Sequence, residues 1–102
     1  MEISVERKEN EILFTIVGEI DEQGANVLKE TFRSQYTASF NKVVFDFKNV
    51  THIGSAGIGK LLLFYKDVAM NGGTICIEHI APGIHELFLT LKLETVFSLS
   101  KS

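Results

Sequence analysis

The chain has 102 residues, with 45 % apolar side chains, 23 % charged side chains and a formal net charge of −3. This size predicts one globular domain with a single modest core, and the acidic balance argues against binding to nucleic acid or to an anionic membrane. The charged N-terminus lacks an apolar signal core, the apolar windows are too short to span a bilayer, and the lone Cys76 cannot form an internal disulfide. We therefore expect a cytoplasmic monomer without membrane insertion.

Strand and helix signals alternate along the chain after an opening β-hairpin, whose turn is predicted at Glu9–Asn10. Asp21 is a plausible N-cap of the first helix, because its carboxylate can accept early backbone N–H groups. The predicted elements are strands 3–8 and 11–20, helix 21–36, strand 42–47, helix 56–70, strand 74–79, helix 82–93 and strand 95–100. This β-β-α-β-α-β-α-β order predicts an α/β fold with parallel pairing after the hairpin and helices on at least one face of the sheet.

The clearest predicted helix, 56–70, shows an apolar stripe and is followed by a stop signal, Asn71-Gly72-Gly73. Leu63 and Met70 fall on the opposite face, where they are expected to be exposed and to extend a docking patch near Ser55. The residues predicted to face the core are Ile58, Leu61, Leu62, Tyr65, Val68 and Ala69.

The segment "GSAGIGK", Gly54 to Lys60, fits the phosphate-binding pattern G-x-x-x-x-G-K. That motif needs Ser or Thr after the lysine to hold Mg²⁺, whereas this chain has Leu61 on the predicted core stripe. A nucleotide site is therefore disfavoured. Ser55 is instead an N-cap candidate, and small neighbours such as Ala56 leave its hydroxyl accessible. It either caps the helix or also carries a covalent phosphate, which a helix N-terminus stabilises.

Few other residues suggest chemistry. His52, His79 and His85 lack ligand partners at metal-binding spacing, so no metal is expected. Cys76 reads as a small core residue rather than a nucleophile. Asp46 is predicted to accept backbone donors that follow it rather than to act as a base. No cofactor is expected, and we predict that the protein is not an enzyme.

Three segments, in order and at the right spacing, resemble the STAS domain, and within it the stand-alone bacterial anti-sigma factor antagonists. Residues 17–21, "VGEID", are similar to the family's "GELD". Residues 43–66 are similar to the part of the family pattern in which a strand is followed by "DSSGLG" and then by a helix. Residues 71–99 are similar to the C-terminal part of the family pattern, "GG…P…L". The resemblance covers nearly the whole chain and implies a mixed sheet of about four to five strands flanked by helices.

The resemblance also implies a function in partner switching. Members bind an anti-sigma factor that is a serine kinase of the histidine-kinase-like ATPase type, which phosphorylates the first serine of the "DS" pair. A PP2C-type phosphatase reverses the modification. By this resemblance Ser55 is the phosphoacceptor. The partner-binding residues predicted on this surface are Asp21, Gly54, Ala56, Gly57, Ile58, Gly59 and Leu63.

One position departs from the family pattern, because Gly54 stands where the family has aspartate before the serine. Three alternatives follow: Asp21 supplies the negative charge, phosphorylation is slower or uses a divergent kinase, or the chain binds its partner constitutively. The process that the switch controls is also left open: it is either transcription or another process such as secretion or biofilm formation. Two rival functions are an accessory subunit that holds a transporter ATPase without phosphorylation, and an ATP-hydrolysing enzyme dependent on Lys60.

Overall fold

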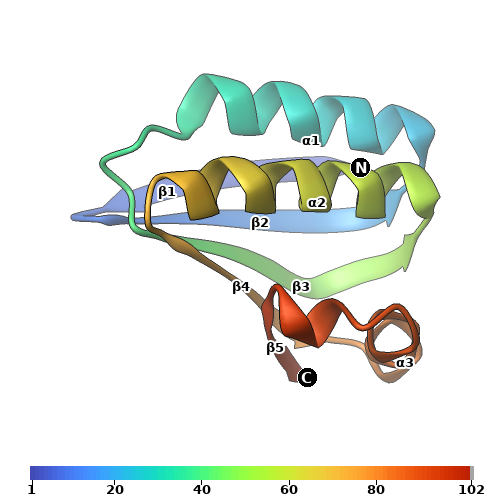
Figure 1. Ribbon diagram of the computed structural model, residues 1–102. Coiled ribbons are helices and arrows are strands. Elements are labelled where there is room, and N and C mark those ends of the chain that lie inside the picture. The colour runs from blue at the N-terminus through green and yellow to red at the C-terminus, as the bar shows by residue number, and fades with distance from the viewer. Residues whose placement is uncertain (102) are drawn as a thin grey trace.

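A five-stranded sheet carries the helices of this domain in the computed structural model, which describes residues 1–101 (Figure 1). The strands are β1 (Glu2–Lys8), β2 (Glu11–Ile20), β3 (Lys42–Ile53), β4 (Thr74–Ile80) and β5 (Ser98–Lys101). The helices are α1 (Glu22–Gln35), α2 (Ser55–Met70), α3 (Pro82–Thr90) and a short 3-10 helix, η1 (Leu93–Thr95). The predicted α/β fold and element order are confirmed, and η1 is the addition.

The strands lie in the sheet in the same order as in the sequence, β1-β2-β3-β4-β5. β1 and β2 form the predicted antiparallel hairpin around Glu9, whose φ is 55°. β2 to β5 pair in parallel, so each of these pairs is joined by a crossover that contains a helix. Because the carboxyl ends of parallel strands meet at one edge, the loops that follow β2 and β3 emerge side by side.

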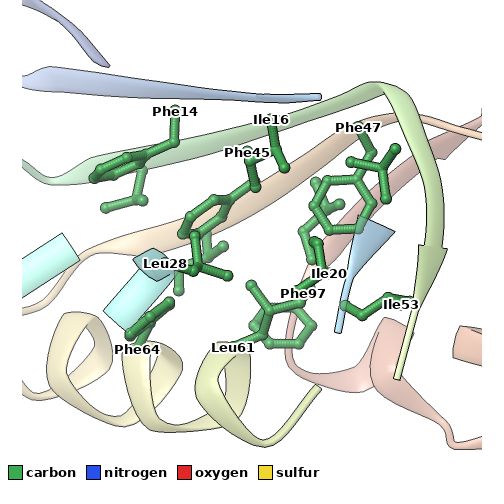
Figure 2. Close-up of a cluster of buried hydrophobic side chains, with 14 of the residues drawn as sticks. Phe14, Ile16, Ile20, Leu28, Phe45, Phe47, Ile53, Leu61, Phe64 and Phe97 are labelled. Carbon is green, nitrogen blue, oxygen red and sulfur yellow. The ribbon is translucent and has the colours of Figure 1, made fainter. Parts of the chain in front are cut away.

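The core lies between the sheet and the helices α1 and α2, which run side by side over one face (Figure 1). Four aromatic rings form its centre. The Phe45 ring of β3 lies 5.1 Å from the Phe14 ring and 5.9 Å from the Phe64 ring, and Phe32 stacks on Phe64 at 4.0 Å between centroids. Figure 2 shows how aliphatic side chains such as Leu28 extend this layer. Burial of these rings and of the aliphatic side chains around them drives the assembly of the domain.

The face of α2 that meets the core differs from the predicted stripe. Gly57, Leu61, Phe64 and Val68 are buried, whereas two residues assigned to the stripe, Leu62 and Ala69, are exposed. The segment "LLLF" is apolar at every position, so its periodicity cannot fix the rotation of the helix. The large flat ring of Phe64 fills the space beside Phe32 and Phe45, and that packing sets the rotation.

Three element boundaries differ from the prediction by three residues or more. α3 ends at Thr90 rather than at position 93, because the chain turns at Lys92, whose φ is 58°, before η1 begins. β3 extends to Ile53, six residues beyond the predicted end at position 47, and β5 begins at Ser98 rather than at position 95. The second part of β3 pairs with β2, whereas its described pairing with β4 ends at Asp46. Polar residues such as Asn49 are tolerated there because that part of the strand lies at an edge.

Candidate functional site

Two loops at the carboxyl edge of the sheet form the candidate site. Ile20 and Ile53 are register partners at the ends of β2 and β3. The Gly54 N–H donates to the Ile20 carbonyl at 3.0 Å, so the residues that follow the two strands are held together. Asp21, just before α1, and Ser55, the first residue of α2, are consequently placed at neighbouring helix starts.

Asp21 is the N-cap of α1, as predicted. Its Oδ1 accepts the Gly24 N–H at 2.7 Å, and its backbone carbonyl accepts the Ala25 N–H at 2.8 Å. Asp21 is nevertheless exposed, at the edge of the sheet where α2 also begins. Asp21 can therefore hold the helix in place and present negative charge at the same time.

The N-cap of α2 was predicted wrongly. Gly54 is the N-cap residue, with φ −94° and ψ 179°, and Ser55 is already the first helical residue. The reason is that β3 continues to Ile53, which leaves one residue to link strand and helix. The Ser55 hydroxyl is therefore not used as the cap, and Ser55 is exposed.

The helix start leaves backbone donors near Ser55. The first intrahelical hydrogen bond runs from the Ile58 N–H to the Gly54 carbonyl at 3.1 Å. The N–H groups of Ser55, Ala56 and Gly57 precede it, in the positions that helix geometry leaves without a partner inside the helix. Together with the positive end of the helix dipole, these groups favour a negatively charged substituent near the Ser55 hydroxyl.

The segment Gly54–Lys60 has no phosphate-binding loop. It is helical from Ser55 onward, so Gly59 and Lys60 lie in the second turn, where their backbone groups belong to the helix. Leu61 is fully buried and cannot serve as the Mg²⁺ ligand that the nucleotide motif requires. This geometry removes the structural basis for a nucleotide site in this segment.

The residues that follow Ser55 in α2 have different roles. A Cβ atom on Gly57 would lie 2.6 Å from Ile20 Cγ2 and 2.8 Å from Ile53 Cγ1, so this glycine lets α2 approach the sheet. A Cβ atom on Gly59 would meet no other atom within 4 Å. Ala56 and Ile58 are half-buried at the edge of the same surface. Leu63, by contrast, lies between α1 and α2 with half of its surface exposed.

One prediction for a residue outside this site is confirmed. The Asp46 carboxylate accepts the Lys48 N–H at 3.0 Å, as expected of a residue that satisfies nearby backbone donors. The expectation that Cys76 is a core residue is not met, because it alternates along β4 with the buried Ile75 and Ile77 and is itself only half-buried. One interaction was missed: His79 Nδ1 lies 3.1 Å from Asp46 Oδ1. His79 has φ 58° in an irregular part of β4, and a local backbone irregularity of that kind leaves no signal in the sequence.

Within residues 1–101, no three His, Cys, Asp or Glu side chains are grouped closely enough to hold a metal ion. Over the same residues, no helix combines the length and apolar character needed to cross a bilayer.

A family model, that of the STAS domain, matches residues 2–102. The chain belongs to the STAS domain family. The anti-sigma-B factor antagonist of Bacillus subtilis (strain 168) is 28 % identical to this STAS domain over 100 residues, which cover 96 % of this chain and 89 % of the relative.

Two solved structures share the fold of this STAS domain. An anti-sigma factor antagonist from Mycobacterium paratuberculosis has a TM-score of 0.86 and 22 % identity, covering 99 % of this chain and 86 % of the other. The Bacillus cell fate determinant SpoIIAA in its phosphorylated form has a TM-score of 0.77 and 13 % identity, covering 99 % and 93 %. The expected STAS-like arrangement of a mixed sheet flanked by helices is therefore confirmed.

The Gly54 position of this STAS domain leads to a stability prediction. Gly54 has backbone angles that any residue adopts, and a Cβ atom there would meet only the Ile20 carbonyl oxygen, at 3.9 Å. We expect Gly54→Asp to raise the free energy of unfolding by roughly 1 kcal/mol, because the carboxylate caps α2, complements its dipole and restricts the unfolded chain.

Urea unfolding at low and high salt measures this effect. Gly54→Asn is the matched control, since asparagine caps a helix equally well without charge. An aspartate variant that is no more stable than the asparagine variant at low salt would show that the dipole contributes nothing at this position.

Proposed function

We propose that this STAS domain is an anti-sigma factor antagonist that works by partner switching. With Ser55 unmodified, the domain binds an anti-sigma factor that is a serine kinase of the histidine-kinase-like ATPase type. Phosphorylation of Ser55 releases it. The observation that carries the proposal is the exposed Ser55 hydroxyl at the start of α2, beside the Asp21 loop. The relative named an anti-sigma-B factor antagonist supports the same function.

The surface around Ser55 suits a charge-controlled interface. Gly54, Ala56, Ile58 and Gly59 surround the serine with small or apolar groups, and the first turn of α2 contains no acidic residue. A phosphate on Ser55 adds about −2 charge to that surface. The helix N-terminus stabilises the modified state, while a partner that packs apolar groups on the loop loses affinity because the phosphate would have to be desolvated.

The covalent step transfers the γ-phosphoryl group of ATP to Ser55 Oγ. The bond between the β-γ bridging oxygen and the γ-phosphorus breaks, ADP leaves, and the hydroxyl proton passes to a base on the kinase. Hydrolysis by a PP2C-type phosphatase returns the serine and inorganic phosphate. Gly54 removes the carboxylate that the family has beside the serine, and Asp21 on the adjoining loop supplies negative charge in its place.

The proposed surface does not use every predicted residue in the same way. Gly57 is buried against Ile20 and Ile53, so it sets the position of α2 rather than touching a partner. Asp21, Gly54, Ala56, Ile58 and Gly59 form the proposed contact surface. Leu63 lies eight residues beyond Ser55, about 12 Å along the helix axis, and belongs to a different part of the surface.

The test combines phosphopeptide mass spectrometry with affinity capture from the protein's own cells. We expect phosphate on Ser55 in the wild-type protein and none in Ser55→Ala. Ser55→Ala is expected to retain a histidine-kinase-like ATPase, which phosphorylates the wild-type protein when ATP is added. Ser55→Glu is expected to capture at least about 100-fold less of this ATPase, a loss comparable to that of an interface hot spot.

The Asp21→Asn variant separates the effect of the Asp21 charge on phosphorylation from its effect on folding. Asparagine caps a helix as well as aspartate does, so the variant should stay folded and lose only the dipole contribution of about 0.3–1 kcal/mol. Its phosphorylation changes if the Asp21 charge matters. Capture of the same ATPase by Ser55→Ala and Ser55→Glu alike, with no phosphate on Ser55 under several growth and stress conditions, would refute the switch. Retention of a transporter ATPase instead would indicate an accessory subunit.

A further inference from the structure

A groove between the two long helices lies apart from the Ser55 loop. It has a volume of about 190 Å³. The stacked rings of Phe32 and Phe64, 4.0 Å apart, close its floor. Its lining is Lys29, Phe32 and Arg33 from α1, and Leu63, Phe64, Lys66 and Asp67 from α2.

The groove is basic on a chain that is acidic. Lys29, Arg33 and Lys66 contribute three cationic groups against the single carboxylate of Asp67, whereas the whole chain has a net charge of −3. The ion pairs found within residues 1–101 are Lys42–Glu11 and His79–Asp46, so none of the three cationic side chains is paired there. Cations that surround an apolar floor favour a ligand with the reverse pattern, apolar on one side and acidic at its margins.

The shape of the groove indicates a helix rather than a small molecule. Ligand sites for small molecules usually have volumes of roughly 300–1,000 Å³, and this groove holds only one or two side chains. α1 and α2 lie side by side (Figure 1), so the depression between them forms a track into which the ridge of a third helix can pack. Leu63, with 51 % of its surface exposed, forms an apolar wall of this track.

Because the groove has a basic lining, an apolar floor and an elongated shape, we propose that it binds an acidic amphipathic helix of a partner protein. Apolar anchors of that helix pack on Leu63 above the two rings, and its flanking carboxylates pair with Lys29, Arg33 and Lys66. Because Leu63 lies about 12 Å along α2 from Ser55, this contact adds a second attachment point that does not depend on the state of the serine.

The test uses a designed peptide and the whole domain labelled with ¹⁵N. The peptide has about 18 residues, long enough to form a helix in water, with leucines at i, i+3, i+4 and i+7 and glutamates beside them. We expect saturable amide shifts concentrated at residues 29–33 and 63–67, and an affinity that falls as salt is raised. Lys29→Glu/Arg33→Glu is expected to weaken binding at least 10-fold, and Leu63→Ser several-fold.

Arg7→Glu/Lys8→Glu is the matched control, because it makes the same change in net charge at exposed positions of β1. It should bind the peptide like the wild type, and each variant must show the wild-type melting curve. Equal binding of a peptide with scrambled leucines, or of one with lysine in place of glutamate, would overturn the proposal. So would an equal loss of binding in the β1 variant. Shifts at the groove that depend on protein concentration alone would overturn it in favour of a second copy of the chain. Selective binding to phosphatidylglycerol vesicles would overturn it in favour of a membrane.

Discussion

Phe45→Ala is expected to lower the free energy of unfolding by about 3–5 kcal/mol, the usual range for removing a buried phenylalanine. The ring is fully buried and lies within 6.5 Å of the rings of Phe14, Phe32 and Phe64. It therefore joins β2, β3 and both long helices, and the resulting cavity cannot close without moving several elements. A domain of this size has only about 5–15 kcal/mol of stability, so the melting temperature should fall by at least about 12 °C.

Thermal unfolding followed by circular dichroism measures this effect. Met70→Ala is the control, since Met70 has 77 % of its surface exposed and its truncation should change stability by no more than about 0.5 kcal/mol. A Phe45→Ala variant as stable as Met70→Ala would contradict the central position that the structure assigns to this ring.

The second large effect concerns two glycines of α2 that are two residues apart. Gly57→Ala is expected to destabilise the domain by roughly 1–3 kcal/mol, because the new methyl group overlaps Ile20 Cγ2 and Ile53 Cγ1. These atoms belong to β-branched side chains with restricted χ1 rotamers, so the start of α2 must move away from the sheet. Ser55, which begins that helix, would move with it.

Gly59→Ala provides the matched comparison. Its methyl group meets no atom within 4 Å, and alanine is favoured over glycine inside a helix by about 0.8–1 kcal/mol. Parallel urea titrations should therefore show opposite signs for the two substitutions. If Gly57→Ala also raised the midpoint, the close approach of α2 to Ile20 and Ile53 would not be a tight constraint.

The order of elements could be predicted from the sequence because its signals are local and strong. The β-branched and aromatic residues of β2, the Asp21 cap and the Gly72 stop each report on their own neighbourhood, and Gly72 indeed has φ 77°. The exposure of Leu63 and Met70 was also predicted correctly. These features need no knowledge of which segment packs against which.

The misplaced features all depend on contacts between distant segments. The burial of Phe64 in place of Leu62 is decided by the ring of Phe32 on another helix. The wrong cap at Ser55 follows from the extension of β3, which is held by pairing with β2 and not by an apolar run of its own. The groove at Lys29 and Leu63 joins residues 34 positions apart, so no sequence window contains both.

The sequential order of the strands has a consequence for synthesis on the ribosome. Each new strand from β2 to β5 pairs with the strand that the chain has just completed, so no strand has to wait for one that is made much later. The hairpin can form first, after which each helix and strand adds to an existing edge as it leaves the exit tunnel. The α1–β3 segment completes the sheet region that contains Phe14 and Phe45, and α2 then brings in Phe64. The nascent chain is therefore expected to gain protease resistance in steps, with the largest step after α2 has left the tunnel and before α3 has left it.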